Sequence, residues 1–146
     1  MRIHSDRRHA FAATPEALWA AMAQVDSYRT WWPWLRHLEA TVLGEGERWR
    51  AVVQPPVPYR LAFELRLHEV VATRRVTAEV TGDIAGVARI EIERTDDGSS
   101  LHVVSDLRPV TGVLRAVGRL APPVARFGHD WVLDAGLRQF RRHALD

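Results

Sequence analysis

The chain contains no cysteine, no lysine and no asparagine among its 146 residues. Without cysteine it has no disulfide, no thiolate nucleophile and no thiolate ligand for a metal. Without lysine, neither Schiff-base chemistry nor the lysine-dependent phosphate-binding loop is available. Because lysine and asparagine both use A-rich codons, their joint absence indicates a high-GC genome, and we expect a bacterial source.

Long apolar runs are also missing. No stretch approaches the roughly 18 residues that a membrane span requires, and residues 1–19 lack the apolar core of a signal peptide. We therefore expect a cytoplasmic protein with no stable membrane insertion. No repeat or low-complexity tract divides the chain, and its length allows a sizeable core, so we expect one domain over residues 1–146.

The basic residues are all arginine, and the formal net charge is only +2. Such a small excess gives no reason to expect a nucleic-acid partner. The arginines gather in short clusters at residues 6–9, 73–75 and 138–143. We predict that these clusters form solvated faces.

The N-terminal third predicts one strand followed by two short helices. Residues 2–13 alternate loosely, as a strand does. Thr14, Pro15 and Glu16 are a capping residue, a first-turn proline and an acidic residue at the positive end of a helix. A second short helix or turn over residues 26–32 ends at a proline, because the residue before proline avoids the helical conformation.

From residue 35 the apolar period changes to two, which indicates strands. The clearest alternation covers residues 59–70, from Tyr59 through Leu61, Phe63 and Leu65. Short turns separate the segments, so the strands are predicted to pair antiparallel. The predicted strands of this region cover residues 35–44, 46–54, 59–70, 74–83, 84–94 and 101–109.

The C-terminal third is helical again. A helix over residues 111–121 ends at two prolines, and residues 123–145 predict a helix of about six turns. His129, Gly136 and Phe140 recur on one face of it. Glycine in mid-helix costs roughly 1 kcal/mol relative to alanine, so we expect this helix to approach another element closely there, for instance the sheet.

This order predicts an α+β fold in which a curved antiparallel sheet of about seven strands wraps around the long C-terminal helix. It resembles the START-like helix-grip superfamily, also called SRPBCC or the polyketide cyclase/dehydrase and lipid-transport group. The resemblance is carried by "ATPEALWAAMAQVDSYRTWWPWL" at residues 13–35 and "FGHDWVLDAGLRQFRR" at residues 127–142. It implies a cavity between sheet and helix that accepts an apolar or aromatic molecule.

The remaining motifs exclude several kinds of chemistry. The histidines show no metal-ligand spacing, and we predict no metal site. There is no G-x-S-x-G elbow and no glycine-rich loop between a strand and a helix. We therefore expect neither a covalent nucleophile nor a cofactor.

His129 is the best candidate for a catalytic acid or base, because a histidine on an apolar helix face titrates near neutral pH. The alternative is a structural histidine hydrogen-bonded to the backbone or to residues 27–32. Asp130, beside it, is predicted to pair on the surface with Arg126 or Arg138.

The predicted cavity is lined from several elements. Ser105 falls in the inward register of its strand. If Trp49 points inward, Arg48 and Arg50 point outward, whereas the reversed register would place an arginine against a ligand carboxylate. The complete set of predicted lining residues is Trp31, Trp32, Trp34, Trp49, Tyr59, Leu61, Phe63, Val76, Ile90, Ser105 and Phe140.

Three tryptophans stand within four residues, at positions 31, 32 and 34, around Pro33. They cannot all point inward from a short turn that a proline interrupts. We predict that one or two of the rings fill the core and that at least one borders the cavity entrance. Packing alone, or an oligomer contact, is the alternative.

Three functions stay open, and the sequence favours the first. It is non-catalytic binding of a small hydrophobic or aromatic ligand, such as a lipid or a polyketide-like molecule. The second is an aromatase/cyclase-like enzyme that uses His129. The third is a protein-interaction module without a ligand, for which a filled interior and exposed tryptophans would argue. A homodimer stays open as well.

Overall fold

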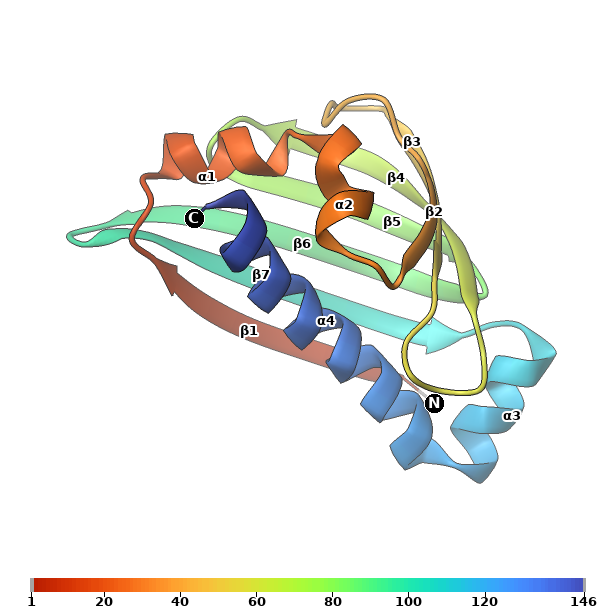
Figure 1. Ribbon diagram of the computed structural model, residues 1–146. Coiled ribbons are helices and arrows are strands. Elements are labelled where there is room, and N and C mark those ends of the chain that lie inside the picture. The colour runs from red at the N-terminus through yellow and green to blue at the C-terminus, as the bar shows by residue number, and fades with distance from the viewer. Residues whose placement is uncertain (1, 146) are drawn as a thin grey trace.

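The computed structural model describes residues 2–145 and places a long helix across one face of a curved seven-stranded sheet (Figure 1). Met1 and Asp146, the ends of the predicted domain, lie outside the described residues. The strands are β1 Ile3–Phe11, β2 Leu35–Glu39, β3 Arg48–Val53, β4 Leu61–Val71, β5 Arg75–Gly82, β6 Ile84–Thr95 and β7 Gly98–Pro109. The helices are α1 Pro15–Met22, the 3₁₀ turn η1 Val25–Ser27, α2 Tyr28–Trp31, α3 Gly112–Leu120 and α4 Pro122–Ala144.

The sheet confirms the predicted fold class. Its strand order is β1-β7-β6-β5-β4-β3-β2, and every neighbouring pair is antiparallel. Because β1 pairs with β7, the first strand closes the edge that the last strand would otherwise expose. The helices α1, α2 and α4 lie on the same face of the sheet, which we call the inner face (Figure 1).

Helix α1 begins where the capping pattern predicts. The Thr14 hydroxyl accepts a hydrogen bond from the backbone N–H of Ala17 at 3.1 Å, and a proline occupies the first turn. Leu18 and Met22, one turn apart, are buried against the sheet. The sequence therefore determines both the start of this helix and the face that it buries.

The strands alternate between inner and outer faces, with two departures from the sequence prediction. Trp49 is buried on the inner face, so Arg48 and Arg50 point outward. Strand β4 begins at Leu61, so the prediction that Tyr59 belongs to this strand is wrong. Strand β2 ends at residue 39 rather than 44, because residues 40–47 form a loop between two strands.

A chain of aromatic rings fastens helix α4 to the rest of the molecule. The ring of Phe140 lies 5.6 Å from Trp31, which lies 5.9 Å from Trp32, which stacks at 5.7 Å on Trp34. The Trp32 indole donates a hydrogen bond to the Gly136 carbonyl oxygen at 2.9 Å. Aromatic pairs of this kind add about 0.5–1.5 kcal/mol each beyond the area they bury.

Both glycines on the buried face of α4 make close contacts, although not with the sheet. A Cβ at Gly136 would lie 3.5 Å from the Trp34 ring, so the helix approaches another part of the chain closely here, as predicted, but that part is the segment that carries Trp34 and not the sheet. A Cβ at Gly128 would lie only 2.7 Å from the Tyr59 hydroxyl oxygen. The two positions therefore tolerate a methyl group differently, because 3.5 Å is ordinary contact and 2.7 Å is an overlap.

We predict opposite behaviour for two glycine-to-alanine substitutions in α4. Gly136→Ala should raise the free energy of unfolding by about 0.5–1 kcal/mol, since alanine stabilises a helix interior and its methyl group fits. Gly128→Ala should gain less or lose stability, because the Tyr59 hydroxyl must move. Urea denaturation of the two variants measures the difference.

A double-mutant cycle isolates the contact. Tyr59→Phe removes the atom that the new methyl group would meet. In that background Gly128→Ala should stabilise the helix as Gly136→Ala does. If Gly128→Ala behaves alike with tyrosine and with phenylalanine, the hydroxyl does not limit the approach of the helix.

Candidate functional site

A row of small side chains crosses the middle of the inner face. Ser5 pairs with Ser105, which pairs on its other side with Ala88, which pairs in turn with Ala78. Both serines are buried, and the two alanines are half-buried. Small residues at four consecutive strands take up little of the volume between the sheet and α4.

Two polar atoms on facing surfaces of the interior have no hydrogen-bond partner. Ser105 has an exposed fraction of 5%, and its hydroxyl oxygen is unpartnered. The Nε2 atom of His129, on the buried face of α4, is also unpartnered. Within residues 2–145 the one other such atom is Oδ1 of Asp106, on the outer face and 3.2 Å from Nε of Arg2. A buried polar group without a partner costs about 1–3 kcal/mol, so these positions call for an explanation.

His129 contacts the Asp130 carboxylate, which Arg7 holds in turn, rather than the backbone or residues 27–32. Its Nδ1 atom lies 3.2 Å from Oδ1 of Asp130. The same carboxylate oxygen accepts a hydrogen bond from Arg7 of β1 at 3.2 Å, and Arg7 also pairs with Asp134. With Nδ1–H donating to Asp130, the neutral ring presents the lone pair of Nε2 to the interior.

This network corrects two predictions from the sequence. Asp130 pairs with Arg7, so the predicted partners Arg126 and Arg138 are wrong. Arg7 lies on the inner face of β1 opposite α4, so the prediction that residues 6–9 form a solvated face is wrong for this residue. Its place could be read from the alternation of β1, where Ile3 and Ser5 share its face.

Burial lowers the pKa of His129 below its ordinary value near 6.5, although the hydrogen bond to Asp130 acts in the opposite direction. Burial likewise raises the pKa of the Tyr59 hydroxyl. Both groups are therefore kept neutral over a wider pH range, as an apolar interior requires.

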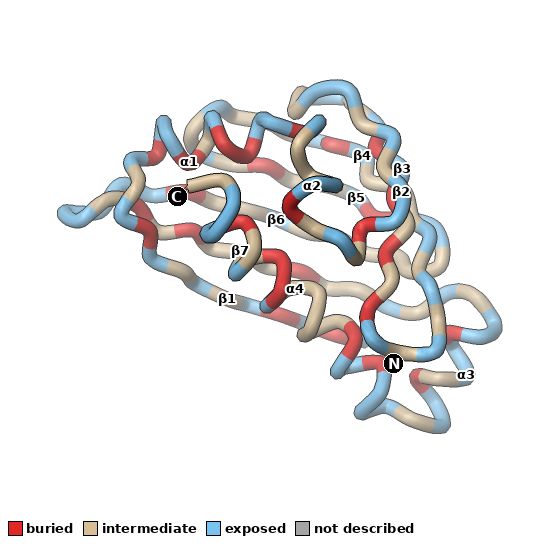
Figure 2. The backbone as a smooth tube through the Cα atoms, viewed as in Figure 1, coloured by how far each residue is buried: buried red, intermediate tan, exposed pale blue. Residues whose placement is uncertain are grey.

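The interior is filled at one end and incompletely covered at the other. Near α1, the inner-face residues Phe11, Leu67 and Leu101 are buried in the hydrophobic core clusters. Toward α3 and the start of α4, Leu61, Ile84 and Leu107 on the inner face are half-buried, whereas Ile3, Val53 and Val80 at the same end are buried (Figure 2).

Along the whole inner face the half-buried set is Leu61, Phe63, Ala78, Ile84, Ala88, Ile90, Val103 and Leu107. Of these, Ile90 and Val103 pack against the core cluster beside α1, and Leu61 and Phe63 pack against the cluster of Leu35, Ala51 and Val53.

The predicted lining residues divide between these two regions. Four of them, Trp31, Trp49, Val76 and Phe140, are buried in the core clusters. Three others, Leu61, Phe63 and Ile90, belong to the half-buried set. Tyr59 reaches α4 from the preceding loop, and Ser105 stands in the row of small side chains.

Trp32 and Trp34, at the contact with α4, are partly exposed, and both are hydrogen-bonded to that helix. Trp32 and Trp34 are half-buried, and the Trp34 indole donates to Oε1 of Gln139 at 2.8 Å. Trp31 is buried. Each of these rings therefore packs against α4 or its neighbours, and Trp131 of α4 extends the contact at 6.2 Å from Trp34.

Two surface hollows lie on the opposite, outer face of the sheet. One measures about 310 Å³ and includes Thr77, Glu79 and Val87. The other measures about 360 Å³ and includes Arg50, Val52 and Glu64. Outward-pointing side chains make up most of both linings, but the first hollow also touches Ala78, Ala88 and Ser105, and the second touches Ala51 and Phe63.

Neither a cluster of metal-binding side chains nor a membrane-spanning helix occurs in residues 2–145. No group of three or more histidine, aspartate or glutamate side chains stands close enough there to hold a metal ion. None of the described helices combines the length and the apolar character that crossing a bilayer requires.

The arrangement of a curved sheet around a long C-terminal helix defines the START-like helix-grip class, and solved structures share it. The Zhui aromatase/cyclase from Streptomyces sp. R1128 superposes with a TM-score of 0.72 at 14% identity, over 97% of this chain and 95% of that chain. Ara h 8.0201 is a second similar structure, with a TM-score of 0.70 at 10% identity over 99% of both chains. TTHA0849 from Thermus thermophilus gives a TM-score of 0.70 at 14% identity, over 99% of this chain and 97% of that chain.

The sequence itself matches a family model described as "Polyketide cyclase / dehydrase and lipid transport" over residues 2–145. The chain belongs to this family. No curated protein matches it. At 10–14% identity the structural likenesses show the shared fold and leave the ligand and the activity to be argued from the site.

The depressed pKa of His129 predicts that stability falls as the solution becomes acidic. Between pH 6.5 and the lower pKa of the folded state, the unfolded chain binds more protons than the folded one, so the free energy of unfolding decreases with falling pH. His129→Gln should flatten this dependence, which urea denaturation at several pH values measures.

His9→Gln is the control. Burial lowers the pKa of His9 as well, so His9 also makes the free energy of unfolding decrease with falling pH. His9→Gln removes that contribution and leaves the one from His129. An unchanged pH dependence in His129→Gln, with a flatter one in His9→Gln, would contradict the assignment.

Proposed function

We propose that the protein binds a small hydrophobic or aromatic molecule, lipid-like or polyketide-like, between the inner face of the sheet and the first half of α4. The observation that carries the proposal is the pair of unpartnered buried atoms, Oγ of Ser105 and Nε2 of His129. A ligand between them would satisfy both. Without one, each buried group keeps its full desolvation cost.

The hydrogen-bonding capacity of these two atoms indicates which polar groups the ligand carries. The Ser105 hydroxyl donates to a carbonyl oxygen, and the neutral His129 ring accepts from a hydroxyl at Nε2. The other side chains of the half-buried region are aliphatic or aromatic. The ligand is therefore a mainly apolar molecule with one or two oxygen groups, such as a phenol, a ketone or a fatty acyl chain with an oxygen substituent.

The half-buried tryptophans suit the border of such a site. Trp34 contacts both Gly136 and Trp131 of α4, so a movement of α4 that admits a ligand changes the surroundings of its ring. We assign Trp32 and Trp34 to the entrance and Trp31 to the core. Their fluorescence then reports ligand binding.

An aromatase/cyclase-like enzyme is the second candidate, and a specific observation favours it. Asp130 holds Nδ1 of His129, which leaves Nε2 aimed at the interior as a base for aldol cyclisation or dehydration. His129→Gln should then abolish turnover while the ligand is still retained. Turnover that survives this substitution removes the candidate.

A protein-interaction module without a ligand has less support. It requires exposed tryptophans, whereas Trp31 is buried and the Trp32 and Trp34 indoles both donate hydrogen bonds to α4. The partly uncovered inner face also differs from the filled interior that this candidate needs.

A filled interior should prevent binding. Ala88→Leu adds bulk to the row of small side chains, and we expect it to weaken binding of the neutral probe N-phenyl-1-naphthylamine at least tenfold. Ser105→Ala should weaken retention of an oxygen-bearing ligand about threefold to tenfold, the worth of one hydrogen bond. Probe emission and tryptophan fluorescence measure the first effect, and native mass spectrometry after exposure to a bacterial extract measures the second.

Val87→Leu is the matched control, because Val87 neighbours Ala88 but points to the outer face, where 59% of it is exposed. It should leave probe binding unchanged. If Val87→Leu weakens binding and Ala88→Leu does not, the probe occupies the outer hollow and the proposal fails.

A further inference from the structure

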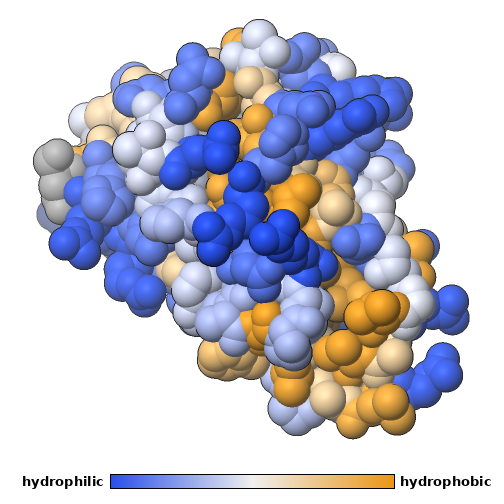
Figure 3. Space-filling view, turned by 45° about the vertical axis from the view of Figure 1, so that its right-hand side comes forward, coloured by the Kyte–Doolittle hydropathy of each residue, from blue (hydrophilic) through white to orange (hydrophobic). Residues whose placement is uncertain are grey.

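Exposed apolar side chains concentrate at one corner of the molecule. Five of the seven large hydrophobic residues that are exposed in residues 2–145 lie within 18 positions. We call residues 107–128 the α3–α4 corner. Its exposed residues, with their exposed fractions, are Val110 41%, Val113 70%, Leu120 82%, Val124 36% and Phe127 52%. Figure 3 shows hydrophobic surface gathered at the end of the molecule that carries α3.

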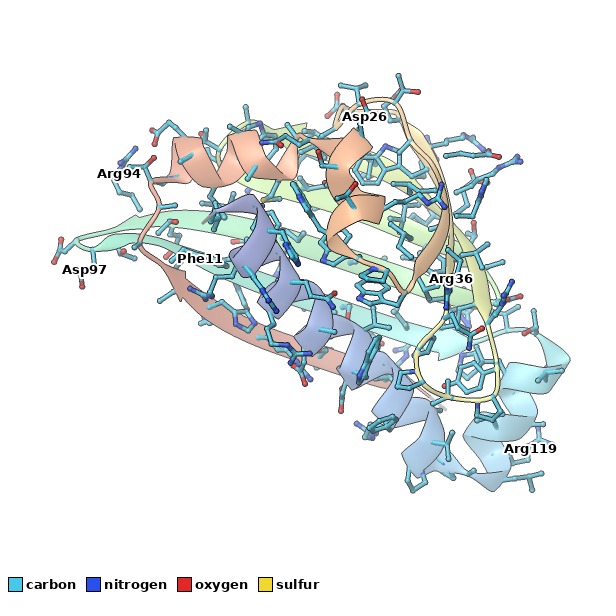
Figure 4. All side chains as sticks on the ribbon, in the orientation of Figure 1. Phe11, Asp26, Arg36, Arg94, Asp97 and Arg119 are labelled. Carbon is cyan, nitrogen blue, oxygen red and sulfur yellow. The ribbon has the colours of Figure 1, made fainter. Side chains whose placement is uncertain are left out.

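All the charged residues of the α3–α4 corner are basic. The corner contains four arginines, at positions 108, 115, 119 and 126, and no aspartate or glutamate, although the chain has 18 acidic residues elsewhere. All four arginines are exposed, and none forms an ion pair with a residue in the range 2–145. Arg119 points away from the body of the protein at the outer end of α3 (Figure 4).

Helix α3 displays both kinds of side chain on its outward side. It buries Leu114 and Gly118. By helical geometry, Val113 and Leu120 lie two turns apart on the same side of the exposed arc, and Arg115 and Arg119 form the flank of that arc. An exposed helix with apolar residues beside unpaired arginines has the composition of a segment that lies in a membrane–water interface.

We propose that the α3–α4 corner docks on the surface of an anionic lipid bilayer without crossing it. The arginines meet the negative headgroups, and Val113, Leu120 and Phe127 enter the boundary between headgroups and acyl chains. Charge argues against a second copy of this face, because an isologous contact would set the arginines of one copy against those of the other with no acid to pair them. A stable protein complex needs a broad, complementary interface. The end of α3 projects from the molecule instead, which suits insertion among lipid headgroups better than contact with a rigid protein surface.

Docking in this way has a consequence for the interior. The corner includes Gly128, which contacts Tyr59, and it directly precedes His129. The half-buried inner-face residues Leu61, Ile84 and Leu107 lie at the same end of the sheet (Figure 1). The bilayer would therefore lie beside that end of the interior.

Vesicle co-sedimentation tests the proposal directly. The protein should bind vesicles that contain phosphatidylglycerol and phosphatidylcholine in equal parts, and should not bind phosphatidylcholine alone. Binding should weaken as salt is added, because salt screens the arginines. Arg115→Gln with Arg119→Gln should weaken it about fivefold for each charge removed. Val113→Ser with Leu120→Ser should weaken it about tenfold.

Matched variants keep the result specific. Arg29→Gln with Arg36→Gln removes the same charge from exposed positions outside the corner, and Val87→Ser removes an exposed apolar side chain from the sheet. These should bind as the unaltered protein does. Circular dichroism and thermal melting check that each variant is folded, and Ala88→Leu, which fills the interior, should still bind vesicles.

Three results would overturn the proposal. The first is no binding to phosphatidylglycerol vesicles at low salt. The second is binding that the corner variants and the matched variants weaken equally. The third is a protein that sediments as a dimer by itself and becomes monomeric in Val113→Ser with Leu120→Ser, which would assign the corner to contact between copies. Loss of probe binding in Ala88→Leu, with vesicle binding intact, separates this proposal from the proposed ligand site.

Discussion

The position of α4 depends on its aromatic contact with α2, and most other features of the molecule depend on the position of α4. A helix on a curved sheet could rotate about its axis or slide along it, since a strip of apolar side chains alone permits several packings. The Trp32 hydrogen bond to the Gly136 carbonyl and the hydrogen bond of Trp34 to Gln139 hold α4 at one rotation about its axis and one position along it. The rings of Phe140 and Trp31 extend the contact into the core.

This anchoring divides the inner face into two regions with different roles. Beside α1 the side chains of sheet and helices are packed and buried, and this part supplies stability through the burial of apolar area. In the middle of the same face the sheet carries the row of small side chains, Ser5, Ser105, Ala88 and Ala78, of which the two alanines are half-buried. A binding site for an apolar molecule needs such a region, because a perfectly packed interior leaves no volume for a ligand.

The charged side chains also differ between the two parts of α4: the carboxylates in its middle are paired with the sheet, and the arginine at its start is unpaired within the described chain. The carboxylates of Asp130 and Asp134 on α4 face Arg7 of β1, so the charged face of the helix is tied to the edge of the sheet. That pairing leaves His129 oriented by Asp130, with its other nitrogen directed inward. The arginines of the α3–α4 corner have no such partners within the described chain and remain available to an external anionic surface.

The sequence by itself determined the order and type of the elements. Local signals suffice for these: the capping threonine at position 14, the change of apolar period from helix to strand, the glycines and prolines at turns, and the inward register of Ser105. Each of them depends on residues a few positions apart. The register of Trp49 stayed open in the sequence, and the structure decided it. The resemblance to the helix-grip class, which the family match over residues 2–145 supports, follows from that order.

Only the tertiary structure decided which distant residues meet. Arg7 and Asp130 are 123 residues apart, and Trp32 and Gly136 are 104 apart. Their contacts depend on how far α4 is rotated and on the register of β1 against β7, neither of which a local pattern contains. The same is true of Tyr59, which was predicted to begin a strand but lies in the loop before β4 and reaches Gly128. Periodicity tells which side of an element is apolar, but the partner across the interior is set by the packing of whole elements against one another.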